Sequence, residues 1–168
     1  MKSIFKLFVA AFLTVAPLTA TAQSNVAHIN VQQLISEMPE VIAAQNELAK
    51  LEKDYTTQID NAFKEFQTKA QSYSSDAANQ TDVTNQARQK ELESMQTNLQ
   101  EFRDSAAQEL QKKQMDLMTP LLEKARNAIT KVGEEQGFNY VIDSSPNGGI
   151  ILANGKDLLA DVTKDLGF

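Results

Sequence analysis

The chain has 168 residues, no cysteine, no tryptophan and one histidine, and its 22 acidic and 16 basic side chains give a net charge of −6. We expect one folding unit at this length, unless part of the chain is elongated. The composition excludes disulfide frameworks, thiolate metal sites, cysteine nucleophiles and metal clusters that need several imidazoles. Nucleic-acid phosphates repel an acidic protein, so we expect no nucleic-acid partner.

The first 22 residues have the organisation of a secretory signal peptide. Lys2 and Lys6 precede an apolar run over 7–17, and an Ala-Thr-Ala site follows it. Because the run falls well short of the ~20 apolar residues that span a bilayer, we expect cleavage after Ala22 and no stable membrane insertion. The exported chain would then keep 14 basic and 22 acidic side chains, a net charge of −8.

A long helical pattern begins after a short predicted strand (26–31), one or two helical turns (32–37) and Pro39. Its apolar or small residues recur at steps of three and four, which marks a narrow seam. The seam consists of Val41, Ala44, Leu48, Leu51, Tyr55, Ile59, Phe63, Phe66, Ala70 and Tyr73. Residues 74–84 are rich in turn and cap formers and predict a loop. A second helical pattern runs from about residue 85 to Gly137, a predicted left-handed cap.

The two seams match each other if the chain folds back near residue 81. Seam residues from Val41 to Ala70 then pair at nearly equal distances from the turn, and among them only Leu48 faces a polar residue, Gln114. In both patterns, some successive seam residues are separated by four positions each time, and these stretches lie opposite each other in the hairpin. Such spacing locally unwinds a coiled coil, so placing the two stretches opposite each other keeps the seam closed. The sequence therefore predicts an antiparallel coiled-coil arm over 41–118, roughly 50 Å long, with its tip loop at about 74–84.

The rest of the chain predicts a small β-containing body over 23–40 and 119–168. Residues 138–143 and 150–153 are expected to form a β-hairpin, followed by a helix over 157–166. The predicted fold class is therefore α+β, mostly α. Three short strands and a projecting arm cannot bury a stable core alone, so we expect the body to oligomerise through its strands.

No constellation of side chains predicts catalysis or a cofactor. His28 stands alone and is expected to pack, while the acidic residues at 134–135, 157, 161 and 165 are expected to be solvated or to cap helices. Gly148 and Gly149 lack the lysine and the spacing of a phosphate loop. We therefore expect no catalytic residue, no metal site, no cofactor and no enzymatic activity.

Four further residues leave alternatives open. Met115 and Leu122 lie off the seam, where they serve either body packing or apolar contacts with a partner. Pro39 and Pro120 lie at the same height of the hairpin. They form a joint between arm and body, or each ends or kinks its own helix. An exported arm on an oligomeric base either holds other chains weakly or acts as a structural coiled-coil spacer or adaptor of the cell envelope.

Five segments in this order resemble the Skp (OmpH-like) family of periplasmic chaperones. They are VAHINVQ at 26–32, ELAKLEK at 47–53, MTPLLEK at 118–124, GFNYVID at 137–143 and DVT at 161–163. The resemblance implies a homotrimer with a barrel-like base, from which three helical tentacles surround a cavity. Such chaperones hold unfolded outer-membrane proteins in the periplasm without ATP.

The resemblance also implies roles for residues of this chain. The trimer base would use six apolar residues, Ala27, Ile29, Val31, Val141, Ile150 and Leu152, and a joint near Pro39 and Pro120 would let the cavity widen. The family's best-known member is strongly basic, whereas residues 41–118 here carry nine basic and thirteen acidic side chains. We therefore expect holding to rely on many weak apolar and polar contacts, or on differently charged clients.

Overall fold

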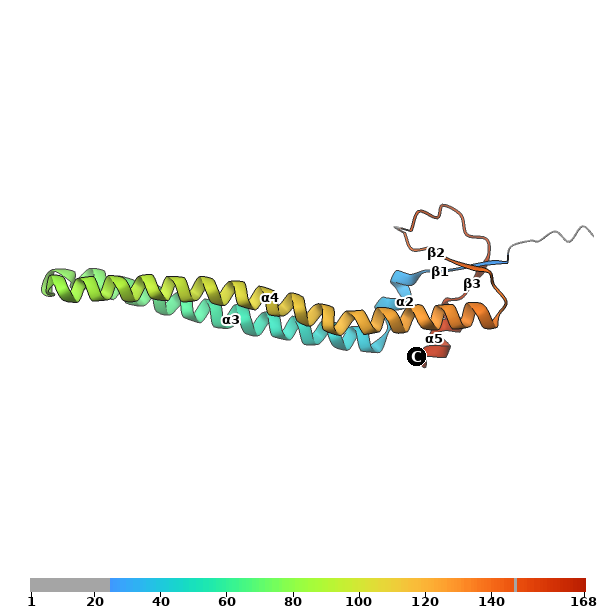
Figure 1. Ribbon diagram of the computed structural model, residues 1–168, viewed down its shortest axis with the longest axis horizontal. Coiled ribbons are helices and arrows are strands. Elements are labelled where there is room, and N and C mark those ends of the chain that lie inside the picture. Colours follow the sequence, from blue (N-terminus) through green and yellow to red (C-terminus); the bar gives the residue numbers. More distant parts are fainter. Residues whose placement is uncertain (1–24, 147) are drawn as a thin grey trace, which may run out of the picture.

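The computed structural model describes residues 25–146 and 148–168, which form a long rod with a small base at one end (Figure 1). The predicted signal peptide, residues 1–22, lies outside the described residues. The chain enters the base through a strand, leaves it for the rod, and returns to complete the base. The fold is thus mostly helical with a small sheet, as the sequence predicts.

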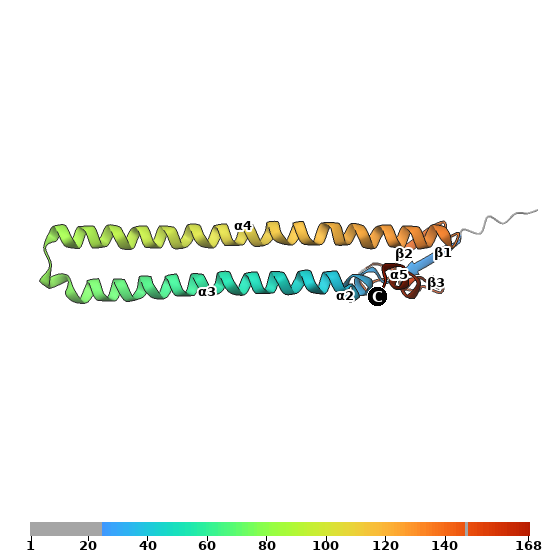
Figure 2. The ribbon, with the colours of Figure 1, turned by 90° about the horizontal axis from the view of Figure 1, so that it is seen from below.

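The rod is an antiparallel pair of helices, α3 (Pro39–Asp76) and α4 (Asp82–Glu135), as Figure 2 shows. Ion pairs join the two helices along their length: Glu40 with Lys124, Glu47 with Lys113, and Lys69 with Glu91. Each pair lies at nearly equal distances from residue 81, so the predicted register is confirmed. The break between the helices is shorter than residues 74–84, because α3 runs to Asp76 and a 3₁₀ turn, η1 (Ala77–Asn79), leads almost directly into α4.

The predicted seam lies between the two helices. Leu99 and Ala106 are buried there, and the rings of Tyr55 and Phe102 meet edge to face with centroids 6.1 Å apart. Phe63 differs from the prediction, because 40% of its surface is exposed. A two-helix rod has no third element to cover its flanks, so this large ring extends past the contact, with the Arg103 guanidinium 6.0 Å from its centroid.

The core of the base forms where α4 extends past the start of α3. Two short helices, α2 (Val31–Glu37) and α5 (Leu159–Leu166), and the sheet contribute to it. The buried residues are apolar throughout: Ala27, Ile29, Leu34, Met38, Val41, Ala125, Ala128, Val132, Leu158 and Val162. Small residues of α4 let the sheet approach closely, since a Cβ on Gly133 would come within 2.8 Å of the Val141 side chain.

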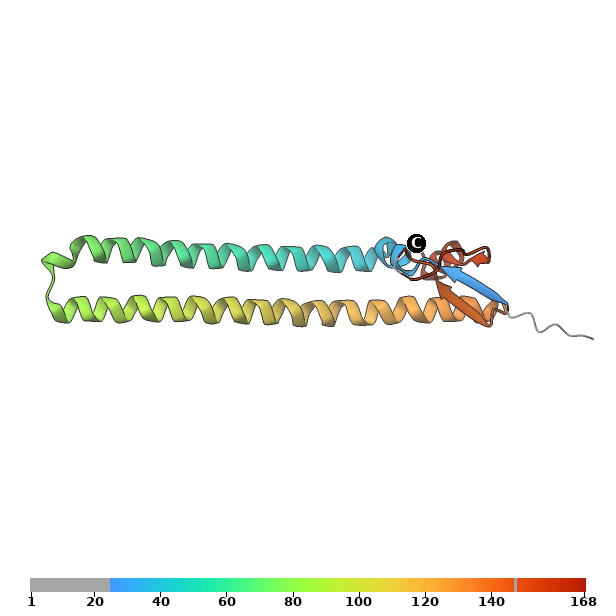
Figure 3. The same ribbon diagram turned by 90° about the horizontal axis from the view of Figure 1, so that it is seen from above.

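The sheet corrects the predicted β-hairpin. It has three strands in the order β2 (Tyr140–Asp143), β1 (Val26–Ile29), β3 (Lys156–Asp157), and both outer strands are parallel to β1. Figure 3 shows β1 and β2 side by side and pointing the same way. Residues 150–153 form no strand, so the prediction that places Ile150 and Leu152 in the sheet is wrong.

Polar contacts at the end of β2 explain why the chain does not turn back along that strand. The buried Ser145 hydroxyl donates to Asp143 Oδ1 (2.6 Å) and accepts from the backbone N–H of Gln32 (3.1 Å). Gly148 then packs so close to the Asp143 carbonyl that a Cβ would lie 2.5 Å from its oxygen. These contacts direct the chain across the start of α2, away from a hairpin.

Two predicted element boundaries also shift. The strand ends at Ile29, because Asn30 caps α2 by accepting from the Gln33 N–H (2.9 Å), so Val31 is helical. The final helix begins at Leu159, whose N–H donates to Asp157 Oδ1 (2.9 Å). The predicted cap at Gly137 is confirmed by its φ of 75°.

The two prolines occupy different environments. Pro39 opens α3 at its first position, where the absence of an N–H costs nothing. Pro120 lies inside α4, which continues through it as one helix. It removes the hydrogen bond that its N–H would make to the Asp116 carbonyl and so weakens that turn.

We expect Leu99→Ala and Phe63→Ala to have unequal effects on the arm. Leu99 is only 8% exposed, so truncation should lower the free energy of unfolding by about 3 kcal/mol. Truncation of the half-exposed Phe63 should lower the free energy of unfolding by only about 1 kcal/mol. Urea unfolding followed by far-UV circular dichroism measures both values, and equal losses would show that Phe63 is buried in solution.

Candidate functional site

The part of the chain that the structure describes holds no cluster of three or more potential metal ligands. The single histidine, His28, lies on β1 with its Nδ1 3.1 Å from the Ser144 hydroxyl. This contact ties β1 to the segment after β2. The candidate sites of this chain are surfaces of the molecule.

A groove of about 670 Å³ lies at the base. Helix α2, the last turns of α4 and strand β2 form its walls. Its apolar lining comprises Val31, Ile35, Leu122, Ala125, Ile129, Phe138, Tyr140 and Val141. Three charged residues, Arg126, Glu134 and Asp143, also line it. Such a lining suits an apolar side chain or segment of another polypeptide.

Apolar side chains also project from the base next to this groove. Tyr140 and Ile142 on β2 are exposed, and β2 forms one edge of the sheet. In the connection after β2, Ile150 is exposed, Ile151 fully so, and Leu152 is 75% exposed. A contiguous run of this kind marks an interaction surface rather than an ordinary solvent face. We call residues 150–152 the apolar loop.

A third surface extends from the groove along the arm. Leu122 and Ile129 line the groove, and Met115 precedes Leu122 by seven residues, so the three share one face of α4. Met115 and Leu122 are both exposed, as is Ile42 near the start of α3. We call Met115, Leu122 and Ile129 the α4 stripe.

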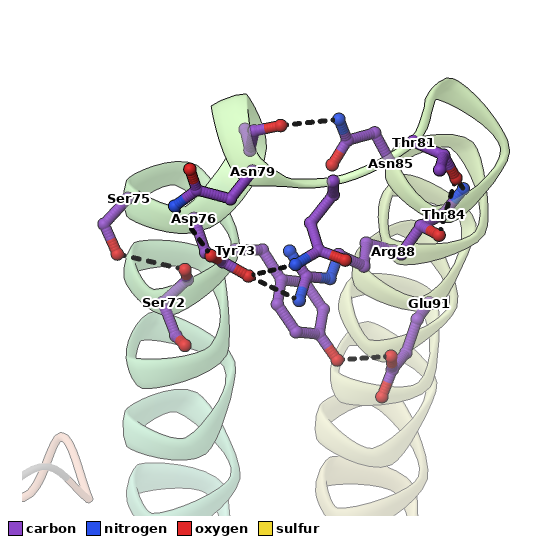
Figure 4. A network of polar contacts seen from close by, with 12 residues as sticks. Ser72, Tyr73, Ser75, Asp76, Asn79, Thr81, Thr84, Asn85, Arg88 and Glu91 are labelled. Carbon is purple, nitrogen blue, oxygen red and sulfur yellow. Dashed lines mark hydrogen bonds and ion pairs between the residues drawn. The ribbon is translucent and has the colours of Figure 1, made fainter.

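The tip of the arm carries a polar cluster (Figure 4). Arg88 pairs with Asp76 (3.1 Å), and its guanidinium lies 4.7 Å from the centroid of the Tyr73 ring. The Tyr73 hydroxyl donates to Glu91 Oε2 (2.6 Å), and Lys69 binds the other oxygen of Glu91. These contacts join α3 and α4 where the apolar seam ends.

The same contacts perturb the tip's acidic groups. Hydrogen bonds from Lys69 and then Tyr73 hold the pKa of Glu91 below its ordinary value. The pKa of Asp76 is lowered first by its hydrogen bond with Arg88 and then by Asn79. Both carboxylates are stabilised in the charged form, which strengthens the tip at neutral pH.

The sequence-predicted site residues fall into distinct places. Ala27 and Ile29 lie fully buried in the chain's own core, while Val31 and Val141 line the groove. Ile150 and Leu152 project from the apolar loop, and Met115 and Leu122 lie on the α4 stripe. Pro39 and Pro120 lie where the arm meets the base.

Sequence reasoning missed Tyr140, Ile142 and Ile35 as surface candidates. Tyr140 and Ile142 alternate with Val141 along β2, and that alternation could have placed them on the opposite face of the strand. Ile35 carries no comparable signal, because a two-turn helix leaves its faces ambiguous.

Comparisons with known proteins agree with the resemblance seen in the sequence. Residues 25–166 match the family model described as outer membrane protein (OmpH-like). The chaperone protein Skp of Yersinia enterocolitica is 25% identical over 159 residues, covering 92% of this chain and 93% of the relative. Skp of Pectobacterium atrosepticum is 20% identical over 151 residues, covering 90% of each.

A solved structure shows that the fold is shared. It is an outer membrane chaperone (OmpH-like) from Caulobacter crescentus CB15, with a TM-score of 0.75 over 86% of this chain and 85% of that chain, at 12% identity. No helix in the described ranges, 25–146 and 148–168, is both long and apolar enough to cross a bilayer.

Acid should weaken the arm at its tip. The lowered pKa values of Asp76 and Glu91 mean that their contribution to stability is complete above about pH 4.5 and is lost as the pH falls through their folded-state pKa values. Glu91→Gln should therefore show a smaller decrease in urea midpoint between pH 7 and pH 3 than the wild type. An identical decrease in both proteins would contradict the assignment.

Proposed function

Because the chain belongs to the OmpH-like outer membrane protein family, we propose that it is an ATP-independent holdase of the periplasm that keeps unfolded outer-membrane proteins from aggregating. Both of the relatives described above are named chaperone protein Skp, and the proposed function involves no enzymatic turnover. The predicted signal peptide supports export, and a homotrimer would supply the cavity in which a client is held.

The observation that carries this proposal is the free-standing arm. α3 and α4 contact each other along the arm, and for most of that length no other element within residues 25–146 and 148–168 covers them (Figure 2). A rod of this kind encloses nothing by itself. Several rods on one base define a space whose walls are helix surfaces, which can surround a polypeptide without a specific pocket.

Contacts with a client would be individually weak. The arm carries an acidic excess and exposes few large apolar side chains, among them Met115, and Leu122 follows on the α4 stripe just inside the base. Many weak apolar and polar contacts retain a chain while allowing it to move and leave. The thioether of Met115 suits this role, because methionine adapts to varied apolar partners.

The base, residues 23–40 and 119–168, would form the trimer, and residues 41–118 would form the arms. Three features support association there: the groove, the open edge at β2 and the exposed apolar loop. Val31 and Val141 in the groove and Ile150 and Leu152 in the loop would make direct contacts, while Ala27 and Ile29 would support the sheet from within. Copies that cover this surface would remove the sheet edge from solvent.

A joint at the root of the arm would adjust the cavity to its client. Pro39 begins α3, and Pro120 interrupts the hydrogen bonding of α4 at nearly the same height. Bending is easiest where a helix lacks a hydrogen bond. Larger clients would then spread the arms without disturbing the base.

Leu152→Asp should dissociate the assembly. The side chain is 75% exposed, so a charge there leaves the single chain intact but is costly in a buried interface. Val83→Asp is the matched control, since Val83 is 77% exposed at the far end of the arm. Light scattering should show monomers for the first variant and the wild-type mass for the second. An unchanged mass for Leu152→Asp would show that the apolar loop is not part of the interface.

The purified mature protein should suppress the aggregation of several unrelated unfolded outer-membrane barrels without ATP. About one trimer per client molecule should be enough. Replacing Met115 with serine should weaken suppression while the mass stays that of the wild type, because Met115 lies on the arm and outside the groove. Val83→Ser, which removes an exposed apolar group off the stripe, should leave suppression unchanged. Suppression of no client would favour the alternative function, a coiled-coil spacer or adaptor of the envelope.

A further inference from the structure

The reversal at the tip is built without the residues that usually force one. Between Pro39 and Pro120 the chain contains neither glycine nor proline. Among the residues that the structure describes, none other than glycine has a positive φ. A helix that stops at a left-handed glycine cannot easily continue, whereas this break uses only ordinary backbone conformations.

The break depends on two residues. Ala77 is already helical (φ −59°, ψ −38°) and begins the 3₁₀ turn η1. Gln80 (φ −112°, ψ 159°) and Thr81 (φ −73°, ψ 157°) are extended. Rotation of these two residues into the helical region, with smaller adjustments of Asp76 (φ −101°, ψ 2°) and of the 3₁₀ turn, would join α3, η1 and α4 into one helix. Alanines 77 and 78 favour that state.

Local hydrogen bonds hold the reversed form. Thr81 caps α4 by accepting from the Thr84 N–H (3.2 Å), and Asn85 Nδ2 donates to the Ala77 carbonyl (3.0 Å). The Gln80 N–H also donates to the Ala77 carbonyl (3.3 Å). A continuous helix would break the Thr81 and Asn85 contacts, because its own backbone bonds would take up these groups.

The contacts between the helices behave differently. The pairs Tyr73–Glu91, Lys69–Glu91 and Asp76–Arg88 each join residues at nearly equal distances from residue 81. The apolar seam has the same symmetry. A second copy laid antiparallel on an opened chain would therefore present every one of these partners at the same place.

We propose that the tip is an exchange hinge and that its partner is a second copy of this chain. With Gln80 and Thr81 helical, α3 of one copy packs along α4 of the other, and each copy forms one helix from Pro39 to Glu135. At each end, β1 of one copy pairs with β2 and β3 of the other. The product is an arm of double length that joins two bases through native contacts.

Concentration and the strength of the turn set the balance between the two forms. Packing of α3 on α4 of the same chain competes with packing on α4 of a second copy. The effective concentration within one chain is in the ~mM range, so the reversed form dominates in dilute solution. Weakening a hinge loop favours exchange between copies, because the remaining contacts are the same in both forms. This exchange is independent of any client.

The test weakens only the local contacts. Thr81→Ala combined with Asn85→Ala should raise the fraction of double-mass species at least about tenfold after refolding from urea at ~100 µM protein, as the loss of two net hydrogen bonds predicts. Light scattering gives the mass, and small-angle X-ray scattering should show an increased maximum dimension. Helix content should stay at the wild-type level.

Two controls separate exchange from general weakening. Glu91→Gln removes contacts that both forms share, so it should not raise the double-mass fraction. Asp82→Pro, added to the double variant, should abolish that fraction. Residue 82 is the first of α4 and follows an extended residue, which suits proline. In a continuous helix the same proline would lie in the interior.

The proposal is overturned if the double variant keeps its helix content and forms no more double-mass species than the wild type. It is equally overturned if the added proline leaves the double-mass fraction unchanged. If the double variant fails to fold, the wild type and Asp82→Pro are compared after refolding near 1 mM, the effective concentration of closure. Double-mass species in the wild type alone support exchange, and equal amounts in both, or none in the wild type, overturn it.

Discussion

The structure depends on the antiparallel seam between α3 and α4. The seam is narrow, so two helices satisfy each other and need no third element over most of the arm. Because the hairpin returns the chain to its starting point, β2 arrives beside β1 although the whole arm separates them in sequence. The additional turns of α4 then provide the surface on which α2, α5 and the sheet assemble. The packing of α3 against α4 therefore forms the arm and also brings together the segments that build the base.

The two-helix arrangement leaves apolar side chains exposed at the base and along α4. A compact domain of similar mass would bury most of its large side chains, whereas here the groove, the apolar loop and the α4 stripe remain open. The groove and the α4 stripe share Leu122 and Ile129. In the rest of the arm, ion pairs and a thin apolar seam hold the two helices together. The remaining side chains of the arm are mostly polar, with an acidic excess. Association at the base and weak contact along the arm are the uses that this distribution favours.

Both ends of the arm are controlled by local backbone chemistry. At the root, Pro39 begins α3, and Pro120 removes one backbone hydrogen bond from α4. At the tip, a threonine cap and a cluster around Arg88 and Glu91 hold the two helices where the apolar seam ends (Figure 4). The rod between these ends is regular because neither glycine nor proline interrupts it.

The sequence alone determined the arm, its register and the cap at Gly137, because the spacing of apolar residues along a helix is local information and two such patterns can be matched by symmetry. It could not determine the sheet. Short apolar runs such as Ile150 to Leu152 suit a strand in isolation, yet whether they pair depends on contacts made by distant residues. Here Ser145 ties the end of β2 to α2, which turns the chain away from a hairpin and leaves the apolar loop exposed. Only the tertiary structure decided that Phe63 would be half-exposed and that Val31 would line a groove, since burial depends on which elements are present to cover a side chain.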